Sequence, residues 1–161
     1  MRKIWLIVAL FIVVTNGCKC KQEPSPEYMK KAELAGNEYT SASERAGKND
    51  PAGYLKLYEM ARNDDNVYPT DWQEVSKEKV FFLLYLNTEL WVTTFSKVDS
   101  EKFKDFVKDA GIEVSRSGRP KGVSNEQFKE TIFINLRKFK GDKKEIELVD
   151  YVLGLYGRKR R

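Results

Sequence analysis

Hydrophobic residues recur along most of the chain at spacings of three and four, the period of an α-helix that buries one face. The pattern is clearest over residues 51–62, 70–90, 100–110, 125–139 and 143–156. A further helix is expected from Pro26 to about Arg45, although its apolar face is poor in large side chains. The pattern predicts an all-α protein, an irregular helical bundle of five to six helices.

Helix-capping residues mark where several of these helices begin or end. Asp50 precedes Pro51, which is favoured at the first helical position. Ser124 stands three residues before Gln127, the spacing of a capping box. Gly111 is the expected end of the helix over residues 100–110, because glycine accepts the backbone conformation that closes a helix.

The segment "VFFLLYL", Val80–Leu86, is apolar almost all round, so its helix is expected to be the central buried one, with Leu86 and Leu90 among its inward residues. The residues that follow are less clear. Residues 90–96 are rich in β-branched and aromatic side chains, so a short strand is the alternative to a continued helix. A second short strand is the alternative at residues 112–114.

The first eighteen residues have a different pattern. Arg2 and Lys3 precede eleven apolar residues, Ile4 to Val14. A helix that crosses a bilayer needs about 20 apolar residues, whereas the apolar part of a secretory signal has about 7–15. Export is therefore predicted. The run is followed by Thr15, Asn16, Gly17 and Cys18.

Residues 1–18 resemble the signal peptide of a bacterial lipoprotein. In that class the signal is removed before a cysteine whose sulfur carries diacylglycerol, and the new amino group usually receives an acyl chain such as palmitate. The resemblance implies cleavage after Gly17 and lipid attachment at Cys18. Thr15 and Asn16 depart from the usual aliphatic and small residues of the class. Lys19 follows the cysteine, and the resemblance then implies the outer membrane in preference to the inner membrane.

Three other interpretations of this segment stay open in the sequence. The apolar run could remain as an uncleaved anchor, or cleavage after Gly17 could be that of an ordinary secreted protein. Cys18 and Cys20 could also form a metal or redox site, but two thiols cannot complete a four-ligand zinc site in a chain without histidine. If Cys18 is acylated, Cys20 has no partner within the chain.

These signals divide the chain into four parts. Residues 1–17 are the predicted signal peptide, and residues 18–28 the lipidated cysteine with a polar tether. Residues 29–157 are the predicted helical domain, and residues 158–161 a basic tail.

Charge is distributed unevenly along the chain, whose net charge is +5. Residues 22–76 carry 11 acids and 6 bases, whereas residues 116–144 carry 9 bases and 3 acids. The chain ends in Arg158, Lys159, Arg160 and Arg161. This tail is a candidate contact for anionic lipid or an acidic polymer, with a solvated surface as the simpler interpretation. A nucleic-acid partner is not predicted, because the export signal removes the protein from the cytoplasm.

Catalytic motifs are absent from the sequence. There is no histidine, no glycine-rich phosphate loop and no nucleophile elbow. Glu74, Glu78 and Glu89 lie on or beside the most apolar helix, and two of them could act as an acid–base pair, although such carboxylates are usually solvated. The aromatic residues expected either to line a ligand groove or, more commonly, to belong to the core are Trp72, Tyr85 and Trp91. No cofactor and no metal are predicted.

These observations predict a non-enzymatic envelope lipoprotein, held in the membrane by acyl chains on Cys18, that binds a protein partner in the envelope. The partner is unidentified. An assembly factor similar to pilotins and an immunity or inhibitor protein are the two versions, both by analogy. The alternative is a structural or surface lipoprotein that contacts lipid or cell wall through its basic C-terminal part.

Overall fold

The computed structural model describes residues 24–64, 66–112 and 118–160. Those residues form α-helices and no strand, so the predicted all-α class is confirmed. They contain seven helices, more than the five to six expected: α2 (Pro26–Gly47), α3 (Pro51–Arg62), α4 (Thr70–Leu86), α5 (Thr88–Phe95), α6 (Ser100–Ala110), α7 (Asn125–Lys138) and α8 (Lys143–Leu155).

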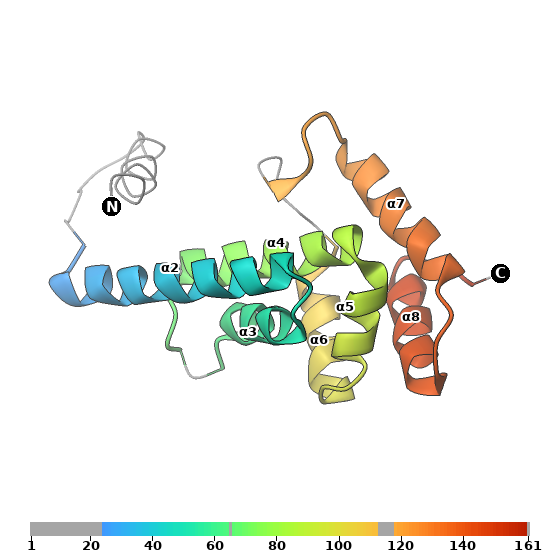
Figure 1. Ribbon diagram of the computed structural model, residues 1–161, viewed down its shortest axis with the longest axis horizontal. Helices are drawn as coiled ribbons and strands as arrows, with labels where there is room; N and C mark the ends of the chain where they lie inside the picture. The colour runs from blue at the N-terminus through green and yellow to red at the C-terminus, as the bar shows by residue number, and fades with distance from the viewer. Residues whose placement is uncertain (1–23, 65, 113–117, 161) are drawn as a thin grey trace.

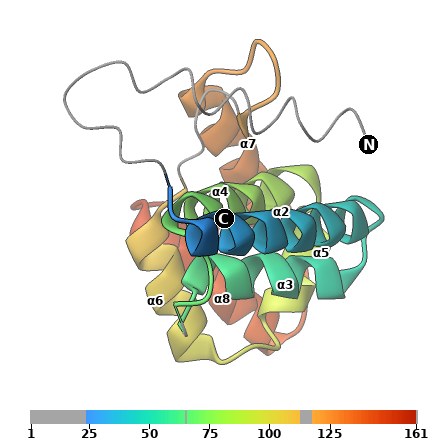
Figure 2. The ribbon, with the colours of Figure 1, turned by 90° about the vertical axis from the view of Figure 1, so that its left-hand side faces the viewer.

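Three helices lie side by side along the long axis of the molecule, with α2 and α4 in the same direction and α3 antiparallel to both (Figure 1). The other end is built from α5, α6, α7 and α8, with α7 leaning outward above α8 (Figure 1). In the view along the long axis, the start of α2 faces the reader and the C-terminus lies behind it (Figure 2). The two ends of the described chain are therefore at opposite ends of the molecule.

Aromatic side chains from α3, α5 and α6 join the two ends of the molecule. The rings of Phe95 and Phe103 stack with centroids 4.5 Å apart, and Tyr58 meets Phe95, Phe103 and Phe106 edge-on. Trp91 is fully buried beside them, and its indole N–H donates to the Val80 carbonyl at 3.0 Å. This polar group is thus satisfied inside an otherwise apolar core.

The predicted caps are found in the structure. Asp50 accepts from the Ala52 N–H at 2.9 Å, and Pro51 opens α3. Ser124 and Gln127 exchange both bonds of the predicted capping box, at 2.9 and 3.1 Å. A second capping box, Asp142 with Glu145 at the start of α8, was not predicted. These bonds satisfy backbone donors that a helix start leaves without partners.

At residues 90–96 the helix is confirmed and the alternative of a short strand is wrong, because this segment belongs to helix α5 and buries Trp91, Val92 and Phe95 in the core. Core packing outweighs the β-propensity of the segment. The single long helix over residues 70–90 is also wrong. Asn87 leaves the helical conformation at φ −146° and ψ 81°, and its side chain caps α5 by accepting from Leu90 N–H at 3.1 Å.

The break changes the expected core at one position. Leu86, predicted to face inward, ends α4 and is 58% exposed. Ile112, the first residue of the segment for which a second short strand was the alternative, is buried, and the rest of that segment lies outside the described residues. The helix over residues 26–45 has the poor apolar face expected of it, since its buried residues are Ala35, Ala42 and Ala46.

Candidate functional site

The predicted lipid-attachment site lies outside the described residues, as do Gly17, Cys20 and Arg161. The folded part begins close behind it. Ser25 caps α2 by accepting from the Tyr28 N–H at 3.2 Å, and the helix starts at Pro26, eight positions after Cys18. The helix therefore includes the last three residues of the segment expected to be a tether.

The basic tail is held against the helices by the end of α8. Gly157 has φ 63°, the left-handed conformation, and the Arg158 N–H donates to the Leu153 carbonyl at 2.9 Å. The Gly157 N–H donates to the Gly154 carbonyl at 3.0 Å, which completes a Schellman motif. The chain consequently turns back at Arg158 towards α7.

Acidic side chains neutralise much of the described tail. Arg158 contacts Glu130 at 3.2 Å and lies 5.4 Å from the centre of the Phe133 ring. Arg160 is 3.8 Å from Asp150. Within the described part of the chain, Lys159 alone among the three tail cations has no acidic side chain within ion-pair distance. The tail presents less free positive charge than its sequence indicates.

An open hollow of about 650 Å³ lies beside the tail. It is lined by Asp150, Gly154, Gly157, Arg158, Lys159 and Arg160. A Cβ atom added at Gly154 would meet nothing within 4 Å, so the hollow owes part of its space to this glycine. The hollow can admit an anionic group beside Lys159, but Asp150 in its wall competes for the same cations.

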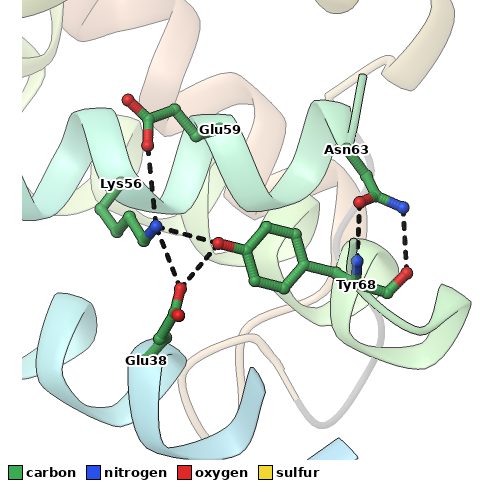
Figure 3. Close-up of polar contacts among 5 residues, drawn as sticks. All are labelled: Glu38, Lys56, Glu59, Asn63 and Tyr68. Carbon is green, nitrogen blue, oxygen red and sulfur yellow. Dashed lines mark hydrogen bonds and ion pairs between the residues drawn. The ribbon is translucent and has the colours of Figure 1, made fainter. Parts of the chain in front are cut away.

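A second polar cluster joins α2, α3 and the loop before α4 (Figure 3). Glu38 Oε2 accepts from the Tyr68 hydroxyl at 2.6 Å and pairs with Lys56 Nζ at 3.0 Å. Lys56 Nζ also donates to the Tyr68 hydroxyl at 2.9 Å, so the three groups form a closed triangle. Glu59 lies 3.8 Å from Lys56 on the same helix. We call Glu38, Lys56 and Tyr68 the triangle below.

The loop that carries Tyr68 is fixed by Asn63, which ends α3 in the left-handed conformation at φ 47°. Asn63 Nδ2 donates to the Tyr68 carbonyl at 2.9 Å, and its Oδ1 accepts from the Tyr68 N–H at 2.7 Å (Figure 3). Gln73 Nε2 donates to the same carbonyl at 3.1 Å. The Asn63 and Gln73 side chains thereby hold the backbone of Tyr68, so the position of its phenol does not depend on the triangle alone.

The pKa shifts in the triangle all favour the ordinary charge states. The Tyr68 hydroxyl, and then Lys56, lower the pKa of Glu38. The hydrogen bond to Tyr68 raises the pKa of Lys56 against the effect of its burial. Burial, and then Glu38, raise the pKa of Tyr68. A general acid or base works best with a pKa near the operating pH, and these shifts lead away from neutrality. The triangle is therefore a structural contact that joins α2, α3 and the loop before α4.

Sequence reasoning missed the triangle. Its members stand 12 and 30 positions apart, on elements whose packing the pattern does not reveal. No spacing or motif in the sequence marks them as partners.

The aromatic residues weighed as a ligand groove lie in separate places. Trp91 is in the core, Tyr85 stacks on Phe128 at 4.7 Å, and Trp72 packs against Tyr39 at 5.5 Å. Among the described residues, no ring contact joins any two of these three side chains. Of the three glutamates, Glu74 pairs with Lys77 at 2.8 Å and is exposed, and Glu89 is exposed in the first turn of α5.

In the described ranges, no three His, Cys, Asp or Glu side chains are grouped as a metal site would require. No helix in the same ranges has the length and hydrophobicity needed to cross a membrane. No protein-family model, curated protein or solved structure matches the chain. The chemistry and placement of its own residues are what remain to indicate its function.

Proposed function

We propose that this chain is a lipid-anchored protein of a bacterial cell envelope, at the outer membrane, that acts without catalysis by binding a protein partner. One observation carries the proposal: two basic residues, eleven apolar residues and a Gly17–Cys18 junction open the chain in that order. Two acyl chains hold a protein stably at a membrane, because each buried methylene contributes about 0.8 kcal/mol.

The separation of charge along the molecule supports a protein partner. The acidic segment, residues 22–76, includes α2 and α3 at one end of the long axis (Figure 1). Residues 125–160, which form α7, α8 and the described tail, carry 9 bases and 6 acids at the other end. Opposite charge at two ends orients an approaching partner and speeds its association. Both an assembly factor and an immunity or inhibitor protein fit this arrangement.

The anchor is tested by the intact mass of protein purified from membranes, beside a Cys18→Ala variant. We expect a mass of residues 18–161 plus acyl chains, and loss of the acyl chains in the variant. A full-length, unmodified mass would contradict the anchor.

The partner is tested by crosslinking a tagged protein in intact cells before the envelope is dissolved. We expect one envelope protein to be recovered in a constant ratio, and its yield to fall with added salt if charge guides the encounter. The Cys18→Ala variant is the control, because a partner that depends on the envelope location is lost with the anchor. Recovery of the anchored protein alone, after efficient crosslinking, would contradict the proposal.

A second candidate function is direct contact of the basic C-terminal end with anionic lipid or cell wall. The hollow beside Lys159, which has no acidic partner in the described ranges, favours it. We expect a Lys159→Ala/Arg160→Ala protein to bind anionic vesicles more weakly, with a strong dependence on salt. This pair leaves Arg158 and its contacts with α7 in place.

The matched control is Lys143→Ala/Lys144→Ala. It removes the same charge from exposed positions at the opposite end of α8. Equal loss of vesicle binding in the two variants would assign the effect to net charge and would remove this second function.

A further inference from the structure

Helix α2 carries one continuous stripe of apolar residues. Tyr28, Ala32, Ala35, Tyr39, Ala42 and Ala46 follow one another at alternating spacings of four and three. The later part of the stripe is covered by other helices. Trp72 of α4 packs on Tyr39, with Gly36 beside its ring, and Gly53 of α3 lies against the backbone at Ala42 and Ala46.

No helix in the described ranges covers the first part of the stripe in this way. All residues from Pro26 to Lys31 are exposed, and Tyr28 and Met29 have 42% and 46% of their surface accessible. Figure 1 shows why: the start of α2 extends past the beginning of α4 and the end of α3. The first two turns of α2, which carry Tyr28 of the stripe and Met29 beside it, therefore extend beyond the helices that bury the rest of the stripe.

We infer that these two turns of α2 rest on the surface of the membrane that holds the acyl chains of Cys18, with Tyr28 and Met29 at the lipid interface. The inference rests on the proposed anchor. Eight residues extended at up to about 3.6 Å each reach at most about 29 Å, so Pro26 lies within this distance of the lipidated cysteine. The uncovered stripe begins two residues later.

The residues of the overhang suit such an interface. Tyrosine is enriched where a membrane meets water, because its ring is apolar and its hydroxyl is polar. Lys31, beside Tyr28 on the helix surface, pairs with Glu27 at 3.1 Å, and its stem is long enough for the ammonium group to lie at headgroup level while the stem stays on apolar surface. The loop between α3 and α4 lies at the same end of the molecule, and its Val67 is 56% exposed (Figure 1).

The small size of the patch favours a membrane over a protein that arrives from solution. A stable protein–protein interface covers about 800 Å² on each partner, and two helical turns with two half-exposed large side chains offer far less. Free association also costs translational and rotational entropy. An acyl-anchored protein is already at the membrane, so a weak apolar contact next to the anchor is sufficient to hold the helix down.

The test places a polarity-sensitive fluorophore on the overhang of the lipidated, full-length protein in vesicles of mixed neutral and anionic phospholipid. Tyr28→Cys carries the probe on the stripe. Lys30→Cys is the matched control, since it is exposed, two residues away and about 200° further round the helix. Both variants also carry Cys20→Ser, so that one thiol reacts when Cys18 is acylated.

The inference predicts a blue-shifted emission for the probe at position 28, and quenching by brominated lipids several-fold stronger than at position 30. Equal quenching at the two positions would overturn it, because nearness to the anchor alone would then explain both. A blue shift at position 28 in the soluble Cys18→Ala protein, without vesicles, would also overturn it, because protein would then cover the stripe. Intact mass of each sample shows whether the acyl chains are present, so loss of the anchor is distinguished from failure of the contact.

Discussion

At the scale of single residues, Gly53 sets the distance between α2 and α3. A Cβ atom at this position would meet the Ala46 backbone N, and would lie 2.6 Å from the Ala42 carbonyl oxygen and 2.9 Å from Arg45 Cβ. Backbone atoms cannot turn aside as a flexible side chain can. Close approach of the two helices therefore requires glycine here.

We expect Gly53→Ala to destabilise the fold by about 1–3 kcal/mol, because α2 and α3 must move apart to admit the methyl group. Gly154→Ala is the matched control. It lies in α8, where a Cβ meets nothing within 4 Å, so its better helix propensity should leave stability unchanged or raise it by up to about 1 kcal/mol. Urea unfolding of the two variants measures the difference. A Gly53→Ala protein as stable as the parent would refute this packing.

Trp91 illustrates a second kind of residue, large and fully buried with a satisfied polar atom. Trp91→Phe should cost about 2–4 kcal/mol, since it leaves a cavity and removes the N–H bond to the Val80 carbonyl. Trp72→Phe should cost less, because Trp72 is only half-buried against α2. Chemical denaturation of both variants, followed by far-UV circular dichroism, compares them; an equal cost would contradict the central place assigned to Trp91.

At the scale of helices, the triangle of Glu38, Lys56 and Tyr68 joins α2 to α3 and to the loop before α4 through hydrogen bonds and an ion pair (Figure 3). The triangle contributes to the stability of this packing because α2 has small side chains on its buried face. Apolar burial per residue is therefore low along this helix, and polar contacts contribute a larger share of what holds it in place.

The triangle predicts that Tyr68→Phe lowers the stability of the fold by an amount that depends on pH. Because the folded-state pKa of Glu38 is lowered, its contribution is fully present above the ordinary glutamate pKa of about 4.3 and is lost as pH falls through the lower folded-state value. Removing the hydroxyl removes the largest cause of that shift. We expect Tyr68→Phe to cost about 0.5–1 kcal/mol at pH 7, a small value because the Glu38 side chain is 46% exposed.

The cost should shrink at pH 3 relative to pH 7, because pH 3 lies below the ordinary glutamate pKa, where the contribution of a carboxyl with a lowered folded-state pKa is already being lost. Urea unfolding of parent and variant at the two pH values measures it. Tyr28→Phe is the control. Tyr28 is exposed on α2, the helix that carries Glu38, and its substitution should show no such pH dependence. A cost for Tyr68→Phe that is constant between the two pH values would show that Glu38 does not carry the effect.

Helix positions followed from local signals that the sequence displays directly. Asp50, Pro51 and Ser124 act on neighbours within four residues, so their roles are visible without the fold. The break at Asn87 was missed because it has no proline or glycine, and because Leu90 continues the helical spacing of the apolar residues that end at Leu86. The triangle was missed for a different reason: contacts between residues 12 and 30 positions apart depend on how helices pack, which periodicity does not specify.

At the scale of the whole molecule, the proposed anchor and the basic tail belong to opposite ends of the long axis. Helix α2 alone, with 22 residues, is about 33 Å long. In Figure 1 the C-terminal end lies beyond the far end of α2. A protein held by Cys18 and resting on the first turns of α2 therefore directs its basic end away from the membrane that anchors it.

This arrangement predicts the order of energy transfer from labelled sites to an acceptor dye in the vesicle surface. With Cys20→Ser and an acylated Cys18, a donor at Glu33→Cys should transfer most, one at Lys48→Cys less, and one at Lys159→Cys least. All three positions are exposed, so labelling leaves the core intact. Transfer at position 159 as strong as at position 33 would mean that the molecule lies flat with its basic end on its own membrane. The predicted order would instead leave Lys159 and the hollow beside it for a partner on the side away from the anchor.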